Sequence, residues 1–167
     1  MARFSTMRRP DWTIRWTEFM KDSMDLAVET RLDWDDDGIT CTSWAGDGIE
    51  ALTGANPFDP YRGSFNGILG ACKAIKESGF KSLDDLIASL FQEVPVGMAQ
   101  TGDLVLVRSV DWAQTALEHN EYKVTAIMPH AVALVDPPLY WAVTEQGLGK
   151  GDLYADAVRA FAIGRTI

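Results

Sequence analysis

The chain has few of the features that mark membrane proteins, disulfide-rich secreted proteins or nucleic-acid-binding proteins. Its longest apolar runs, such as residues 131–135, are far shorter than the roughly 20 residues that a membrane-spanning helix needs. Two cysteines in 167 residues are too few for a disulfide framework. The balance of 15 Lys+Arg against 24 Asp+Glu gives a net charge of −9, which disfavours binding to a phosphate backbone. We therefore expect no membrane span and no nucleic-acid partner.

Metal-binding patterns are also scarce. The two cysteines and two histidines form no CxxC or HxxxH element, so a structural zinc site is not indicated. The acidic residues Asp33, Asp35 and Asp37 alternate as in a calcium-binding EF-hand loop, and Gly38 takes the sixth position. The twelfth position is Trp44, which cannot supply the closing carboxylate. We expect no metal and no cofactor, with calcium at this loop as the alternative.

Positive charge gathers at the start of the chain. The first ten residues contain three arginines and no acid, whereas the remainder contains 12 bases and 24 acids. No continuous apolar segment follows the arginines, so this is not the pattern of a secretory signal. We expect residues 1–10 to form a basic arm, either a frayed terminus or a segment that docks onto an acidic neighbour. Residues 11–167 have the length and the apolar content of one domain.

The hydrophobic period changes from helical to strand-like along the chain. Apolar residues recur every three or four positions in the first part and in short continuous runs after Pro95. This pattern predicts helices over residues 10–30, 40–54, 64–78 and 82–91, followed by strands over 103–108, 130–135, 139–144 and 159–164. The order indicates an α+β fold, with N-terminal helices packed on a mostly antiparallel C-terminal sheet.

The residues with the clearest chemical potential are Cys41 and His130. Cys41 stands at the predicted start of a helix, where unpaired backbone N–H groups and the helix dipole favour a thiolate. His130 begins a predicted strand, from which a ring nitrogen could take the thiol proton and return it to a leaving amine. The alternative is that Cys41 is ordinary core material, because it lies on the apolar face of its helix.

Four blocks of the sequence resemble the NlpC-type, papain-like cell-wall cysteine peptidases, and more closely the compact branch found among phage tail and gene-transfer-particle proteins. The blocks are Trp34 before the cysteine, the Cys41-led segment that closes in Leu52-Thr53-Gly54, the turn Pro60-Tyr61-Arg62-Gly63, and Gly102-Asp103-Leu104-Val105 followed by His130-Ala131-Val132-Ala133-Leu134. The resemblance covers most of the chain between Trp34 and Thr144. It implies a papain-like NlpC-type fold.

The resemblance also implies roles for individual residues. Cys41 would be the nucleophile and His130 the general base. The family's third polar group, which orients the imidazole, falls here on Ala142, so Thr144 or Glu145 would have to replace it. Trp34 would contact substrate or a partner protein.

Two functions follow from this resemblance. The first is a phage tail-tip protein, carried in the virion after synthesis in the host cytoplasm, that cleaves the stem peptides of bacterial peptidoglycan during genome delivery. The alternative is a catalytically inactive structural subunit of the tail tip that retains the fold. In the alternative, the basic arm and residues 110–129 would contact other tail-tip proteins.

Overall fold

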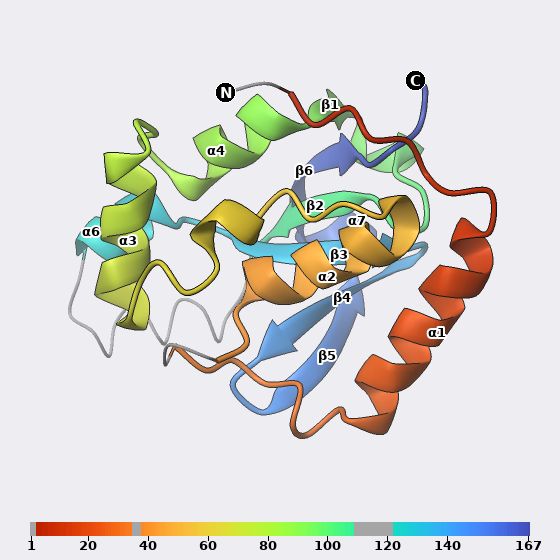
Figure 1. Ribbon diagram of the computed structural model, residues 1–167, viewed down its shortest axis with the longest axis horizontal. Coiled ribbons are helices and arrows are strands. Elements are labelled where there is room, and N and C mark those ends of the chain that lie inside the picture. Colours follow the sequence, from red (N-terminus) through yellow and green to blue (C-terminus); the bar gives the residue numbers. More distant parts are fainter. Residues whose placement is uncertain (1–2, 35–37, 109–121) are drawn as a thin grey trace.

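The structure is a computed structural model that describes residues 3–34, 38–108 and 122–167 (Figure 1). The longer helices come first, and most of the sheet follows them. The helices are α1 (Trp12–Asp25), α2 (Cys41–Thr53), α3 (Gly67–Glu77), α4 (Leu83–Leu90), α6 (Tyr122–Ile127) and α7 (Leu153–Asp156). The strands are β1 (Gln92–Val94), β2 (Leu104–Val107), β3 (Ala131–Asp136), β4 (Leu139–Thr144), β5 (Gly147–Asp152) and β6 (Ala157–Ala162). The predicted α+β class is confirmed.

Within the described residues, the strands form one sheet in the order β1-β6-β2-β3-β4-β5. Every neighbouring pair is antiparallel. The central strands β2 and β3 are buried almost throughout, and β1 and β5 form the two edges. As predicted, the N-terminal helices pack against an antiparallel C-terminal sheet (Figure 1).

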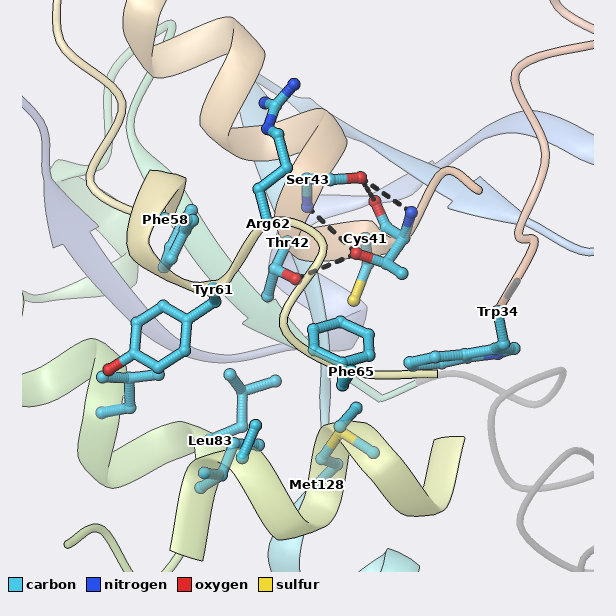
Figure 2. Close-up of a pocket in the computed structure, with 15 residues that line it drawn as sticks. Trp34, Cys41, Thr42, Ser43, Phe58, Tyr61, Arg62, Phe65, Leu83 and Met128 are labelled. Atoms are coloured by element: carbon cyan, nitrogen blue, oxygen red, sulfur yellow. Dashed lines mark hydrogen bonds between the residues drawn. The ribbon is translucent and has the colours of Figure 1, made fainter. Parts of the chain in front are cut away.

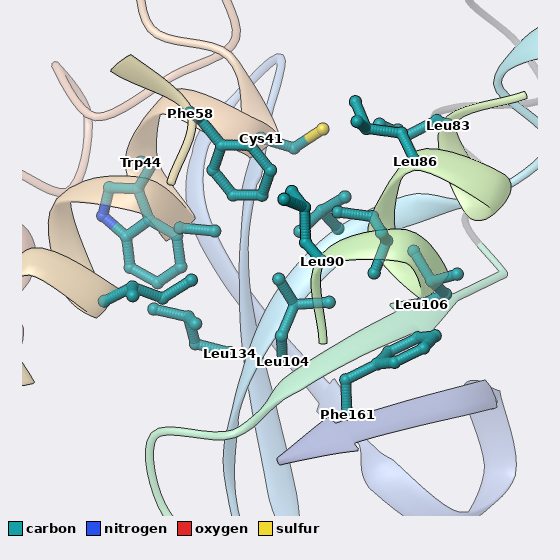
Figure 3. Close-up of a cluster of buried hydrophobic side chains, with 14 of the residues drawn as sticks. Cys41, Trp44, Phe58, Leu83, Leu86, Leu90, Leu104, Leu106, Leu134 and Phe161 are labelled. Carbon is teal, nitrogen blue, oxygen red and sulfur yellow. The ribbon is translucent and has the colours of Figure 1, made fainter. Parts of the chain in front are cut away.

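Alternating side chains divide the sheet into two faces. Val132 and Leu134 of β3 belong to the larger core cluster, which also contains buried residues of α2, α3 and α4 (Figure 3). Ala131 and Ala133 belong to a second cluster on the opposite face, together with Leu153 of α7. This is the expected result of the two-residue period of a strand. Any residue in step with Val132 therefore faces the helices.

The N-terminal segment packs along the domain. The backbone N–H of Phe4 donates to the Leu90 carbonyl at 2.9 Å, and that of Arg8 donates to the Gly164 carbonyl at 2.8 Å. The Arg8 guanidinium also donates to the buried Asp103 carboxylate at 2.9 Å. The interpretation of this terminus as frayed is wrong for residues 3–10, because backbone and side-chain bonds attach them to the domain.

Several elements differ from the sequence prediction at their ends, and a few were not predicted. Strand β4 has the predicted bounds, whereas β6 begins two residues earlier than expected. Strand β5 contains three glycines in Gly-Leu-Gly-Lys-Gly-Asp, a composition that does not favour a strand. Its extended form comes from pairing with β4 over six residues. Residues 35–37, which hold two of the candidate calcium ligands, and residues 109–121 lie outside the described residues.

Candidate functional site

Cys41 is the first residue of α2, and a complete capping box holds that end of the helix. The Thr40 hydroxyl accepts a hydrogen bond from the Ser43 backbone N–H at 3.1 Å. In return, the Thr40 backbone N–H donates to the Ser43 hydroxyl at 2.8 Å. At the other end, Gly54 adopts the left-handed conformation, with a φ of 85°, that ends the helix. The sequence predicted both ends, so the position of Cys41 at the helix start is confirmed.

The Cys41 side chain opens into a pocket with largely apolar walls. In Figure 2 its sulfur points into this space, with Phe65 and Trp34 nearby. The lining residues are Trp34, Thr40, Cys41, Thr42, Ser43, Phe58, Tyr61, Arg62, Phe65, Ala71, Ala74, Ile75, Leu83, Leu86 and Met128. The structure thus brings Trp34 to the same pocket as Cys41, where a substrate or partner contact was predicted.

The surroundings of the thiol differ from the sequence expectation. Burial raises the pKa of Cys41, while backbone hydrogen bonds from Val132, Thr42 and its own residue act in the opposite direction. The loss of solvation has a larger effect on this pKa than the backbone hydrogen bonds that favour the thiolate. A raised pKa favours the neutral thiol, so nucleophilic use of this side chain would require a group that removes its proton.

His130 lies immediately before β3, and its contact with Asp84 of α4 places its side chain on the side of the sheet that the helices cover. Its Nδ1 lies 2.8 Å from Oδ2 of Asp84, a residue in the first turn of α4. Both side chains are largely buried, with 22% of His130 and 14% of Asp84 exposed. The pair joins the end of a strand to the start of a helix across 46 positions of sequence.

Cys41 and His130 both lie next to the start of β3. The backbone of Val132, two residues after His130, contacts the Cys41 thiol. Cys41 and His130 thus both lie on the side of the sheet that the helices cover. His130 does not belong to the described set that lines the pocket.

Of the two residues predicted to orient the histidine, Thr144 is the last residue of β4 and Glu145 lies in the turn that follows it. The Thr144 hydroxyl donates to the Gly147 carbonyl at 2.8 Å and accepts from the Gln146 backbone N–H at 3.2 Å. Glu145 is an exposed residue of the same turn. The hydrogen bond that the structure gives His130 is to Asp84, a residue that the sequence analysis did not single out. No spacing rule relates residues this far apart, so this partner could not have been found from the sequence.

In the portions of the chain that the structure describes, no group of three or more His, Cys, Asp or Glu side chains is arranged to hold a metal ion. Likewise, none of the described helices has both the length and the apolar character needed to cross a bilayer. What the site does contain is a thiol at a helix start and an imidazole paired with a carboxylate. These are the groups used in nucleophilic acyl transfer.

Comparison with known proteins gives a family match. The family model described as "Domain of unknown function (DUF6950)" matches residues 7–163, which includes every residue of the site. No curated protein matches the chain.

Proposed function

The chain belongs to the DUF6950 family, and we propose that this member is a phage tail-tip protein of papain-like, NlpC-type fold that hydrolyses an amide bond in the stem peptides of bacterial peptidoglycan. The observation that carries the proposal is the arrangement of Cys41 and His130. Cys41 begins α2 in an apolar pocket, and His130, paired with Asp84, belongs to the same face of the sheet.

The proposed reaction uses the neutral thiol as its starting state. His130 removes the Cys41 proton as the sulfur attacks the carbonyl carbon of the scissile amide. The C–N bond then breaks, and His130 returns the proton to the leaving amine, which leaves a thioester on Cys41. Water attacks the thioester, releases a carboxylic acid and restores the thiol. The backbone N–H groups at the start of α2 can stabilise negative charge at the reacting centre.

The apolar walls of the pocket fit this role because they exclude water from the reacting thiol. Charge–dipole interactions in such a site are stronger than in bulk solvent. In this proposal the mainly acidic chain reaches the cell wall as part of a larger tail assembly, and its partners are other tail-tip proteins.

A structural tail-tip subunit with an inactive site is the second candidate. The observation that favours it is the raised pKa of Cys41, since burial keeps the thiol neutral rather than as the reactive thiolate. In this case the pocket would serve the packing of α2, α3 and α4, and infection would not require the sulfur.

The test uses purified peptidoglycan and matched cysteine variants. The wild-type protein should release new stem-peptide termini, and Cys41→Ala should lower that rate by about 1000-fold or more because the nucleophile is gone. Cys72→Ala is the matched control: Cys72 is also buried and free of a disulfide but lies within α3, outside the pocket lining. It should retain wild-type turnover.

The two candidate functions also predict different infectivity for phage that carry Cys41→Ala. Immunolabelling of intact particles should place the chain at the tail tip in either case, and its absence from particles would contradict both. Phage carrying Cys41→Ala should infect less efficiently if the chain is an enzyme. Unchanged infectivity, together with no turnover by the wild-type protein, would leave the structural role.

A further inference from the structure

We propose that Asp84 of α4 is the positioning residue of this site, which orients His130 in place of a group on the strand after β3. The inference rests on the proposed function, because it assigns the third polar group of the same Cys41–His130 centre. It differs from the sequence expectation in both the residue and the structural element that supplies it.

The first support is the geometry of the pair. A carboxylate oxygen accepts hydrogen bonds, so Nδ1 of His130 donates to Oδ2 of Asp84 over the 2.8 Å between them. This bond selects the tautomer with hydrogen on Nδ1 and leaves the lone pair on Nε2. The ring is thereby prepared to take a proton from the thiol through Nε2.

The second support is the state of the other carboxylate oxygen. Oδ1 of Asp84 is buried and has no hydrogen-bond partner among the described residues. A buried acceptor without a partner costs free energy, so a position chosen for stability alone would satisfy it. The carboxylate is instead held by the histidine at one oxygen, which is the arrangement expected of a group retained to orient an imidazole.

The third support is that the surrounding charges belong to other pairs. Arg159 of β6 is near enough to Asp84 and Asp85 to interact with both electrostatically. Its guanidinium, however, donates to both oxygens of Glu93 at 2.9 and 2.6 Å. Asp85 is exposed and lies beside Asp84 on α4. The hydrogen bond to Asp84 is thus left to His130.

The rigidity of α4 completes the argument. Ser82 caps the helix by accepting from the Asp85 backbone N–H at 3.1 Å. Leu83 and Leu86, on either side of Asp84, are buried in the main core. The carboxylate therefore sits on a fixed element, as a group that orients a catalytic side chain requires.

The experiment measures how fast Cys41 is alkylated by iodoacetamide near neutral pH, in a Cys72→Ala background so that only one thiol reacts. His130→Ala should slow alkylation because the neutral thiol loses its base. Asp84→Ala should slow it at least tenfold, and the double variant should be no slower than His130→Ala, since the two residues act as one unit. Asp84→Asn, which keeps an oxygen acceptor, should give an intermediate rate.

One control variant and two further measurements separate positioning from general damage to the fold. Asp85→Ala, on the same turn, should alkylate at the wild-type rate. In ¹⁵N spectra of the imidazoles, assigned with His119→Gln, neutral His130 should carry hydrogen on Nδ1 in the wild type and on Nε2 in Asp84→Ala. Thermal unfolding of each variant reports whether it is folded.

The outcomes distinguish this inference from the proposed function. Wild-type alkylation and an unchanged tautomer in folded Asp84→Ala or Asp84→Asn, with slow alkylation in His130→Ala, would overturn the role of Asp84 and leave the Cys41–His130 pair intact. Wild-type alkylation in His130→Ala would overturn both. If peptidoglycan is not cleaved but alkylation and tautomer behave as expected, the role of Asp84 stands and the proposed substrate is wrong.

Discussion

Cys41 and Cys72 are both buried cysteines, but of the two only Cys41 is among the residues that line the pocket, together with Trp34 and Phe65. Burial raises the pKa of Cys41, so less thiolate is present at a given pH than in an exposed cysteine. We predict that the rate of Cys41 alkylation increases with pH and reaches half of its maximum above about 8.5, the pKa of a free thiol.

This prediction is measured by mass spectrometry of iodoacetamide-treated protein across a pH series, with a free cysteine peptide as the reference. We expect a midpoint above that of the peptide because a raised pKa moves ionisation of the thiol to higher pH. A midpoint below that of the peptide would show that the helix N-terminus outweighs burial at this residue, contrary to the structure.

At the scale of the element, α2 depends on its first turn. The capping box between Thr40 and Ser43 satisfies backbone N–H groups that the helix itself cannot, and Cys41 lies inside it. We predict that Thr40→Ala is less stable than Thr40→Ser by about 1 kcal/mol, because both variants lose the methyl group and only the alanine loses the hydroxyl.

Chemical denaturation of the two variants gives this difference, and turnover of peptidoglycan gives its functional counterpart. If the chain has the proposed activity, Thr40→Ser should keep most of it, whereas Thr40→Ala should lose it because the first turn no longer fixes the sulfur. Equal stability of the two variants would mean that the hydroxyl does not cap α2.

At the scale of the whole molecule, Asp103 joins both ends of the chain to the sheet. Its side chain is fully buried and bonds to Arg8 at 2.9 Å and to Arg165 at 2.6 Å. It also accepts from the backbone N–H groups of Ile163 and Gln100. Burial lowers the pKa of Arg8 even though Asp103 acts to raise it, which shows how strongly this cluster is desolvated.

We predict that Asp103→Asn destabilises the fold by about 3 kcal/mol or more, because it leaves two buried guanidinium groups without their counter-charge. Denaturant unfolding measures the loss. The control is Lys73→Ala, which removes the exposed ion pair with Glu77 and should change the stability by less than about 0.5 kcal/mol. A loss below 1 kcal/mol in Asp103→Asn would show that the cluster does not hold the termini.

Much of the architecture was predictable because its signals are local. The period of the apolar residues identified α1 to α4, and the cap residues Thr40, Gly54 and Ser82 located helix ends to within a residue. The continuous apolar runs identified β2 and β3. Strand β5 was not predictable, because its glycines carry no strand preference and its conformation depends on pairing with β4.

The sequence by itself determined the α+β class and the position of Cys41 at a helix start, because caps and hydrophobic periods act between residues a few positions apart. Only the tertiary structure decided the partner of His130, the burial that raises the pKa of Cys41 and the attachment of residues 3–10 through Arg8. Those properties depend on burial and on contacts across 46 to 155 positions of the chain. Side chains so far apart meet only after the helices have packed on the sheet.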